Sequence, residues 1–171
     1  MDEQMISKAV EEVIDRMTSV HDERPHKCKG KGHKMTLALA KSLIEKVEQK
    51  ANEIGLSAVI AVSDQAGRVT AVHCMDDAYI ASYDIAVKKT FTSASLKMST
   101  AGLAKLSQPG QPLYGIQHTN EGKIVIFGGG EPLKVDGEMI GALGVSGGTA
   151  EQDTMLAAYG KEMLKEVVSC L

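Results

Sequence analysis

The sequence is poor in cysteine. Cys28, Cys74 and Cys170 are the three cysteines of a 171-residue chain, they lie far apart, and no two of them form a C-x-x-C pair. Their number is odd, which is atypical of a set of structural disulfides. These features argue against a disulfide framework and fit free thiols in a reducing compartment.

A long apolar run is missing as well. No stretch approaches the roughly 20 apolar residues that a membrane-spanning helix needs. The N-terminus is acidic and amphipathic, whereas a secretory signal peptide is basic and then apolar. An excess of positive charge is also absent, since the net charge is -3. We therefore expect a cytoplasmic protein with no membrane contact and no nucleic-acid partner.

The composition suits one folded domain with a tail, because 43% of the residues are hydrophobic and 24% are charged. Charge is distributed unevenly along the chain. Residues 1–23 carry seven acidic and two basic side chains, whereas residues 24–34 carry five Lys or Arg and no acidic residue. This change predicts an amphipathic N-terminal helix over 1–23, a basic linker over 24–34 and a folded domain over 35–171.

The N-terminal segment has one apolar stripe at helical spacing. The stripe consists of Met5, Ile6, Ala9, Val10, Val13, Ile14 and Met17. Such a helix packs on its own domain, on a neighbouring subunit or on another partner. The run MDEQMISKAVEEVIDRM also resembles the encapsulation peptides of enzymes packaged in bacterial microcompartments, which implies contact with shell or cargo through residues 1–20.

The linker contains three potential metal ligands, His26, Cys28 and His33. Imidazole and thiolate bind zinc and copper well. The spacing matches no common metal motif, however, and five neighbouring cations disfavour a bound metal ion. A solvated basic tether is the favoured interpretation.

From residue 35 the pattern predicts an α+β domain. A first helix has Thr36 as its N-cap and Gly55 after its end. Apolar runs at 57–63 and 68–75 predict a β-hairpin whose first strand is central, because it is apolar on both faces. A helix over 79–96, strands at 123–127 and 139–146, and a helix over 150–168 follow, the last with a capping box at Thr149 and Gln152. This order favours an antiparallel sheet flanked by helices.

The inward face of the predicted last helix is assigned from its apolar spacing. The residues expected to face the core are Met155, Ala158, Tyr159, Met163, Leu164 and Val167.

Residues 124–153 hold eight glycines, including the triple Gly128, Gly129 and Gly130. A phosphate-binding loop would need a Lys and a Ser or Thr leading into a helix, and FGGGEPL has neither. A dinucleotide fingerprint is absent too, because no G-x-G-x-x-G opens a helix in a βαβ unit. We interpret the glycines as tight turns and as places where the backbone lies close to other backbone or to a flat ligand.

A G-x-S-x-G match at Gly144, Ser146 and Gly148 lies between a predicted strand and a predicted helix, as a nucleophile elbow does. An α/β-hydrolase places its histidine after the serine, but the last histidine here is His118. The chain is also short for that fold. Serine hydrolysis is therefore disfavoured.

Five motifs carry a family resemblance. AVSDQAGRVTAVHCMDDA, SYDIAVKKTFTSA, QPLYGI, GKIVIFGGGEPL and GEMIGALGVSGGTAEQD occur in this order over roughly residues 35–168. Together they resemble the heme-binding GlcG/HbpS family, to which the C-terminal domain of PduO-type corrinoid adenosyltransferases also belongs. The resemblance implies a profilin-like or PAS-like domain with a five-stranded antiparallel sheet, assembly into homo-oligomers, and heme or a related tetrapyrrole or corrinoid as ligand.

Heme needs a flat apolar slot, one or two axial donors and cations for its propionates. His73 is the preferred axial ligand of the heme iron, with His118 as the second choice. Met75 should share a face with His73, and Cys74 should face the other way. The other candidates for contact with a tetrapyrrole are Asp76, the propionate partners Lys88 and Lys89, the close-approach residues Gly128, Gly129 and Gly130, and the polar groups of Ser146 and Gly147.

Three classes of function fit these residues. A tetrapyrrole-binding or sensing module without catalysis is favoured, because no residue pair has a spacing that fixes a reaction mechanism. The alternatives are an accessory enzyme of heme degradation or corrinoid metabolism, and a non-catalytic cargo or structural protein of a microcompartment. No catalytic residue is assigned.

Overall fold

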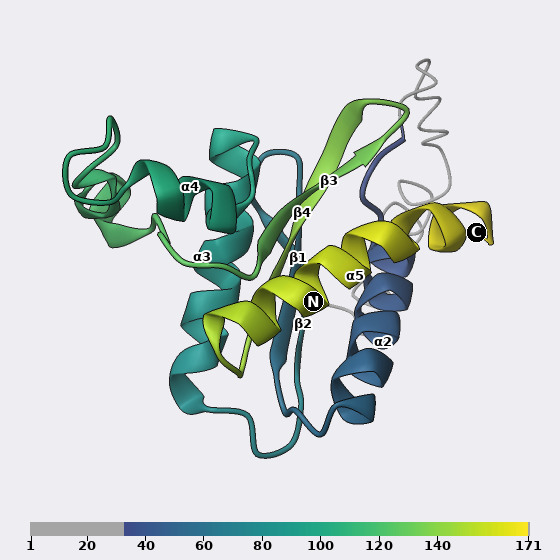
Figure 1. The fold of residues 1–171 in the computed structure, drawn as a ribbon. Helices are drawn as coiled ribbons and strands as arrows, with labels where there is room; N and C mark the ends of the chain where they lie inside the picture. Colours follow the sequence, from purple (N-terminus) through teal and green to yellow (C-terminus); the bar gives the residue numbers. More distant parts are fainter. Residues whose placement is uncertain (1–32, 171) are drawn as a thin grey trace, which may run out of the picture. The chain divides into compact units, whose positions relative to one another are not determined.

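The computed structural model describes residues 33–170, which form an α+β domain with helices on both sides of one sheet (Figure 1). The sheet has the strand order β2-β1-β4-β3, and all neighbours are antiparallel. The strands are β1 (Val59–Asp64), β2 (Val69–Cys74), β3 (Gly130–Val135) and β4 (Glu138–Ser146). The predicted helix over 1–23 and most of the predicted linker lie outside the described residues.

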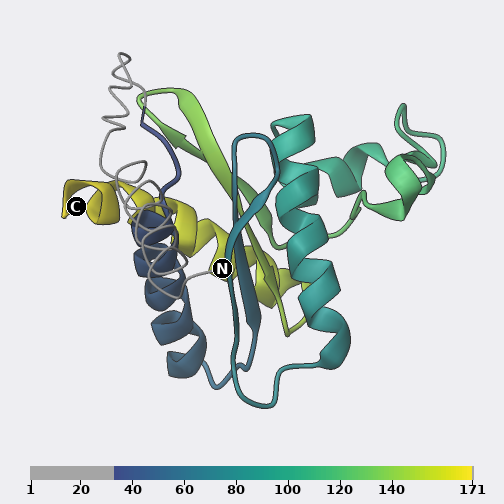
Figure 2. The same cartoon turned by 180° about the vertical axis from the view of Figure 1, so that it is seen from behind.

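Helices α2 (Leu37–Glu53) and α5 (Ala150–Ser169) cover one face of the sheet, as Figure 1 shows. Helix α3 (Ile80–Leu96) covers the opposite face, so that the strands lie between α2 and α3 in Figure 2. The short helix α4 (Thr100–Leu106) follows α3, and two 3-10 turns, η1 (Ile116–His118) and η2 (Asn120–Gly122), precede β3. None of the described helices is long and apolar enough to cross a membrane.

The alternation of β1 explains its place in the middle of the sheet. Ile60 and Val62 enter the large core beneath α2 and α5, whereas Val59 and Ala61 pack toward Ala86 of α3. A strand that is apolar on both faces can be covered by helices on both sides. The prediction of a central first strand and of its hairpin with the second is confirmed.

The predicted helix starts are also confirmed. Thr36 accepts a hydrogen bond from the Leu39 N–H at 3.1 Å, as an N-cap does. At the start of α5, Thr149 and Gln152 form both hydrogen bonds of the capping box. Gly55 has a φ of +67° just after α2, a conformation that glycine adopts without strain.

The predicted strand at 123–127 does not form. The Val125 N–H donates to Thr92 Oγ1 of α3 at 2.9 Å, so this segment is bonded to a helix side chain. The next strand begins at Gly130, the last residue of the glycine triple, and contains Pro132. Because β3 is an edge strand, a missing proline N–H is tolerated there.

The five-stranded sheet that the family resemblance implied is not found among residues 33–170, where the sheet has four strands. The predicted inward face of α5 is also partly wrong. Leu156, Ala157 and Gly160 are buried together with Leu164 and Val167, whereas Met155 is 42% exposed. The reason lies at Gly160, where an added Cβ would collide with Leu143 and lie 2.7 Å from Val47. This close approach fixes the rotation of α5.

Candidate functional site

A buried ion pair joins helices from the two sides of the sheet. Lys89 of α3 is 0% exposed, and its Nζ donates to Asp153 Oδ2 of α5 and to the carbonyl oxygen of Val145 in β4, each at 2.7 Å. Burial lowers the pKa of Lys89, and the hydrogen bond and charge of Asp153 oppose that shift. Lys89 is therefore held inside the domain rather than presented to a ligand.

Asp153 also fixes the loop before α5. Its Oδ1 accepts the backbone N–H groups of Gly147 at 3.1 Å and Gly148 at 3.0 Å. The carboxylate lies in the first turn of α5, where the helix dipole favours negative charge. The end of β4 and the start of α5 are thus tied to Lys89 through one side chain.

The glycine triple is packed against this arrangement. Gly129 has a φ of +109°, and an added Cβ would lie 2.6 Å from the Val145 carbonyl oxygen and 2.7 Å from Lys89 Nζ. A Cβ at Gly130 would lie 2.7 Å from Ser93 Oγ, and one at Gly128 would collide with Thr154. The close approach expected at these glycines is therefore an approach to the chain's own atoms, and Gly128 also lines a hollow at the surface.

Ser146 is buried at the end of β4. Its hydroxyl lies 3.3 Å from the hydroxyl of Ser82 in α3, and the hydrogen bonds of Ser146 within the described residues include no histidine. A serine without a base within reach is not activated as a nucleophile. The contact between Ser146 and Ser82 links the end of β4 to α3.

His73 lies in the edge strand β2, on the face toward α2. Its Nδ1 is 2.9 Å from Glu48 Oε1 of α2, and its side chain is 34% exposed. Met75 shares this face, since its sulfur accepts the Ala58 N–H at 3.4 Å and its side chain packs on the core under α2. Cys74 is exposed, and Asp76 lies in the exposed turn that follows.

The remaining predicted residues lie elsewhere. Lys88 is paired with Asp84 one turn earlier in α3, at 2.8 Å. His118 is exposed in η1, where its Nε2 lies 3.4 Å from the Gln117 amide nitrogen. The structure thus gathers Lys89, the glycine triple, Ser146 and Gly147 at one end of β4. It places His73 two strands away in the sheet order, on β2.

Three partners in these contacts were not predicted as site residues. Asp153 and Glu48 complete the two ion pairs, and the ring of Phe127 lies 5.0 Å from Lys89 Nζ, in cation–π range. Asp153 and Lys89 are 64 positions apart in the chain. No local pattern could have paired them.

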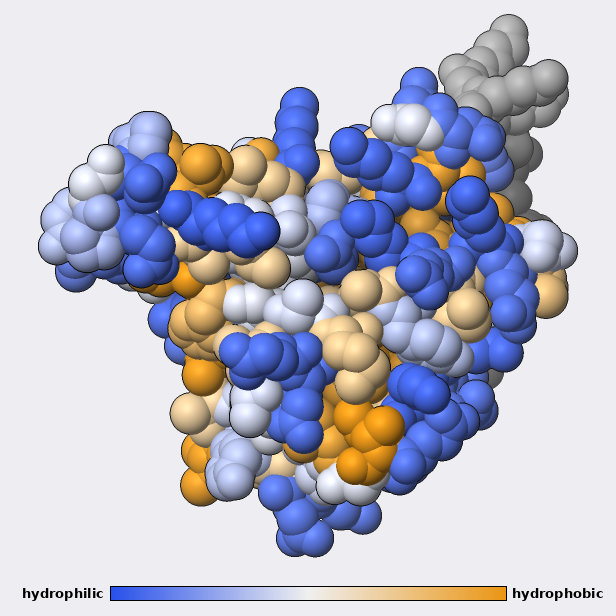
Figure 3. Space-filling view, viewed as in Figure 1, coloured by the Kyte–Doolittle hydropathy of each residue, from blue (hydrophilic) through white to orange (hydrophobic). Residues whose placement is uncertain are grey.

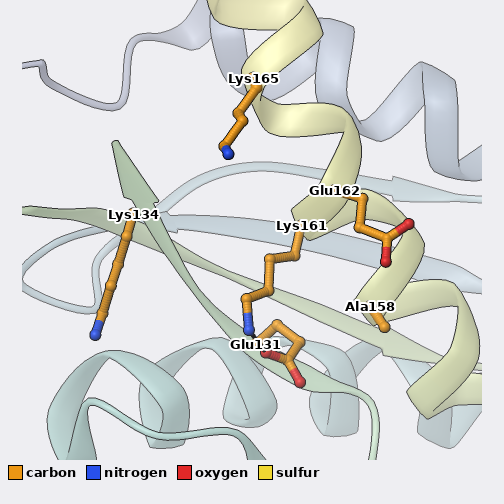
Figure 4. Close-up of a pocket in the computed structure, with 6 residues that line it drawn as sticks. All are labelled: Glu131, Lys134, Ala158, Lys161, Glu162 and Lys165. Atoms are coloured by element: carbon orange, nitrogen blue, oxygen red, sulfur yellow. Dashed lines mark hydrogen bonds and ion pairs between the residues drawn. The ribbon is translucent and has the colours of Figure 1, made fainter. Parts of the chain in front are cut away.

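Two hollows lie along the outer face of α5. One, of about 650 Å³, lies between α4, residues 126–128 and the first turns of α5. The other, of about 420 Å³, lies between β3 and the middle of α5. Figure 4 shows Lys134 extending from β3, and Lys161 extending from α5 toward Glu131. Ala158 lines both hollows.

Comparisons with known proteins agree on one family. The model of the family described as haem degrading protein HbpS-like matches residues 35–162. An uncharacterized 15.0 kDa protein in the dhaT-dhaS intergenic region of Citrobacter freundii is 44% identical over 133 residues, which are 78% of this chain and 94% of that protein.

Two further similarities concern PduO. Corrinoid adenosyltransferase PduO of Salmonella typhimurium is 39% identical over 109 residues, which are 64% of this chain but only 32% of that protein. The crystal structure of the PduOC:heme complex is 34% identical with a TM-score of 0.73, covering 76% of this chain and 94% of the PduOC chain.

Proposed function

The chain belongs to the haem degrading protein HbpS-like family, and from this premise we propose that it binds heme or a closely related tetrapyrrole, with His73 as axial ligand of the iron. A structure similar to this chain is a heme complex. The family's description and this neighbour support the ligand class. The assignment of the axial ligand rests on the surroundings of His73.

The contact between His73 and Glu48 is the observation that carries this assignment. A histidine that binds a metal usually has its other ring nitrogen bonded to a carboxylate or carbonyl, which fixes the tautomer and orients the ring. Here Glu48 Oε1 takes that place at His73 Nδ1. No described residue forms a hydrogen bond with Nε2, and the His73 side chain is 34% exposed, so we infer that Nε2 is the nitrogen that binds the iron.

The test is a titration of the purified, tag-free chain with hemin, followed by the Soret absorbance. We expect a saturable change with a fixed stoichiometry. His73→Ala should weaken binding or shift the Soret band, because the iron loses its donor. Glu48→Gln should weaken heme binding about tenfold. This is the lower end of the loss of metal affinity seen when a metal-bound histidine loses its hydrogen-bond partner. Both variants should keep the far-UV circular dichroism of the wild type.

His118→Ala is the matched control, since it removes an exposed histidine that has no carboxylate partner among the described residues. It should leave the titration unchanged. A Soret band that is unaffected by His73→Ala but altered by His118→Ala would reject His73 as ligand. A parallel titration with cobalamin tests a corrinoid as the alternative ligand, which the PduO relatives suggest.

We infer a role in binding or sensing rather than in heme breakdown. The alternative, an accessory enzyme, predicts that purified protein with reductant and oxygen consumes more heme than it has sites. A binding module leaves the bound heme intact, apart from the slow loss that free hemin also shows. Heme absorbance over several equivalents of hemin distinguishes the two roles.

We also propose that residues 1–20 direct the domain to a partner surface, such as the interior of a bacterial microcompartment, and that the domain forms homo-oligomers in the cytoplasm. The amphipathic stripe and the basic segment after it support the first part. Deletion of residues 1–20 should abolish the localisation of a fluorescent fusion and leave the unfolding transition unchanged. If the deletion instead destabilises the domain, the segment is part of the fold.

A further inference from the structure

The two hollows along α5 share Ala158, and we call them together the α5 groove, with an apolar half and a cationic half. Its apolar half includes Ala101, Ala104, Ile126, Phe127 and Met155. Its cationic half includes Lys134, Lys161 and Lys165 together with Glu131 and Glu162. Ala158 lies at the junction and belongs to both.

The two halves lie in line because their α5 residues share one face of the helix. Met155, Ala158, Lys161 and Lys165 follow one another at intervals of three, three and four residues, which places them in one row. With a rise of about 1.5 Å per residue, the row extends about 15 Å from Met155 to Lys165. A ligand of about 10 Å can therefore contact both halves.

The apolar half favours a planar ring. Phe127 is 42% exposed, and the buried ammonium of Lys89 lies 5.0 Å from its centroid. Because that cation already draws on the electrons of the ring, Phe127 is a poor site for a second cation and a better one for stacking. Small side chains at Ala101 and Ala104 of α4 leave room beside the ring.

The cationic half favours an anion. Lys161 is bonded to Glu131 at 2.9 Å, and the Glu131 side chain is only 11% exposed, so this carboxylate is neutralised. Lys134 and Lys165 form no ion pair with any described residue. Three lysines and two glutamates leave this half with one net positive charge, and the two unpaired ammonium groups come from different elements, β3 and α5 (Figure 4).

The surface around the groove does not resemble a broad protein interface. On the face drawn in Figure 3, hydrophilic residues surround small apolar areas, and no single apolar surface covers the face. Large contiguous apolar patches are the mark of protein–protein contact. Volumes of about 650 and 420 Å³ fall in the range of small-molecule sites.

We propose that the α5 groove binds an amphipathic carboxylate: a planar apolar body lies on Phe127 and Met155, and its anionic group lies in the cationic half, which Lys134 and Lys165 line. This site is distinct from the proposed heme site. Its described lining contains no histidine, and His73 lies on the edge strand at the opposite side of the sheet from β3. The groove thus takes an organic acid that needs no axial nitrogen.

Two dyes with the same aromatic frame test this proposal. 1-Anilinonaphthalene-8-sulfonate carries an anionic group, and N-phenyl-1-naphthylamine lacks it. Bound dye is measured on the full chain by equilibrium dialysis, because bound heme would quench fluorescence. We expect one sulfonate dye per chain, bound about tenfold more tightly than the uncharged dye.

The variants separate the two halves of the groove. The double variant Lys134→Gln with Lys165→Gln should weaken binding of the sulfonate dye about tenfold, at about threefold for each exposed charge. Binding of the uncharged dye should not change. Lys41→Gln, an exposed lysine of α2 with no partner among the described residues, is the matched control and should change neither. Ala158→Leu and Ala104→Leu fill the groove from two different helices, and each should weaken both dyes at least tenfold.

Three results would overturn the proposal. The first is equal binding of the two dyes with no effect of the lysine double variant. The second is displacement of the dye by hemin. If His73→Ala also leaves hemin binding unchanged in that case, the groove is the heme site and His73 is not the ligand. The third is dye uptake that falls as the protein concentration rises, because the groove is then covered by a second copy of the chain. Loss of hemin binding in His73→Ala with dye binding intact would support both proposals.

Discussion

Replacing Lys89 with methionine tests how strongly the buried ion pair stabilises the domain. Methionine has nearly the length of lysine but no charge, so the change removes the two 2.7 Å hydrogen bonds to Asp153 and Val145 without opening a large cavity. It leaves the Asp153 carboxylate buried and without its cation. Removing one partner of a buried pair typically costs about 3–5 kcal/mol of unfolding free energy.

The structure indicates the lower end of this range. Asp153 Oδ1 keeps the N–H groups of Gly147 and Gly148, and the carboxylate stays in the first turn of α5. We therefore expect a loss of about 3 kcal/mol, a large part of the 5–15 kcal/mol that folded domains have. The corresponding fall in the melting temperature is about 10 °C.

A double-mutant cycle with Asp153→Asn isolates the pair. Asparagine keeps an oxygen for the two glycine N–H groups but removes the charge. Each single variant therefore leaves one buried charge without its partner, whereas the double variant leaves no unpaired charge. The double variant should be less destabilised than the sum of the single variants by about 2 kcal/mol. An additive cycle, or a loss below about 1 kcal/mol for Lys89→Met, would refute the argument.

The unfolding assay follows from the composition. The chain has no tryptophan, so far-UV circular dichroism is the suitable signal. Urea is preferable to guanidinium chloride, because it is uncharged and does not screen the pair. Unchanged urea m-values across the four proteins would show that the variants altered stability and not the extent of unfolding.

Three further predictions use the same assay. Gly129→Ala should lower the free energy of unfolding by about 3 kcal/mol or more, because φ is strained at +109° and the added Cβ meets Val145 and Lys89. Gly137→Ala has a φ of +84° and no atom within 4 Å of the added Cβ, so it should lower the free energy of unfolding by only about 1 kcal/mol. Equal losses would contradict the packing argument. Thr149→Ala should cost about 1 kcal/mol by removing the cap of α5, and an unchanged midpoint would show that the cap is replaced. Burial places the pKa of Lys89 below its ordinary 10.5, so the unfolded chain binds the proton more readily than the folded one. The unfolding free energy of the wild type relative to Lys89→Met should therefore rise with pH in the window below 10.5. A difference that falls with pH in this window would contradict the direction of the shift.

The parts of the fold that the sequence predicted are those with a local signal. The hairpin of β1 and β2 follows from two apolar runs and the turn between them, and the starts of α2 and α5 follow from Thr36 and Thr149. Each of these features is decided within about ten residues of chain. Capping and turn chemistry act at that range, so they can be recognised without knowledge of the tertiary structure.

The errors arose where packing decided between local alternatives. Gly160 contributes no hydrophobicity to a helical pattern, yet it permits the close approach of α5 to Leu143 and Val47 that sets the buried face. Residues 130–135 form a strand although Pro132 lacks an N–H group, because an edge strand accepts a proline. Neither outcome is encoded in the spacing of apolar residues.

The ion pairs of the site were beyond local reasoning for a similar reason. His73 and Glu48 are 25 positions apart and lie on a strand and a helix that meet only in the folded domain. Lys89 looked like any lysine on a helix face, which is usually solvated. Its burial depends on Gly129, because only a residue without a Cβ leaves room for the ammonium beside the Val145 carbonyl.

The buried pair and the α5 groove are connected through Phe127. The ammonium that Asp153 holds in place is also the cation behind the Phe127 ring, and Gly128 next to it is packed against Thr154 of α5. The wall of the groove is therefore positioned by the same contacts that stabilise the end of β4. Lys89→Met should accordingly weaken the binding of both naphthyl dyes to a similar degree, since it disturbs the Phe127 ring and not the cationic half. The Lys134 and Lys165 variants should weaken the binding of the anionic dye alone. If Lys89→Met leaves both dyes unaffected while the domain is destabilised, the pair acts on stability alone and the ring is held by its other neighbours.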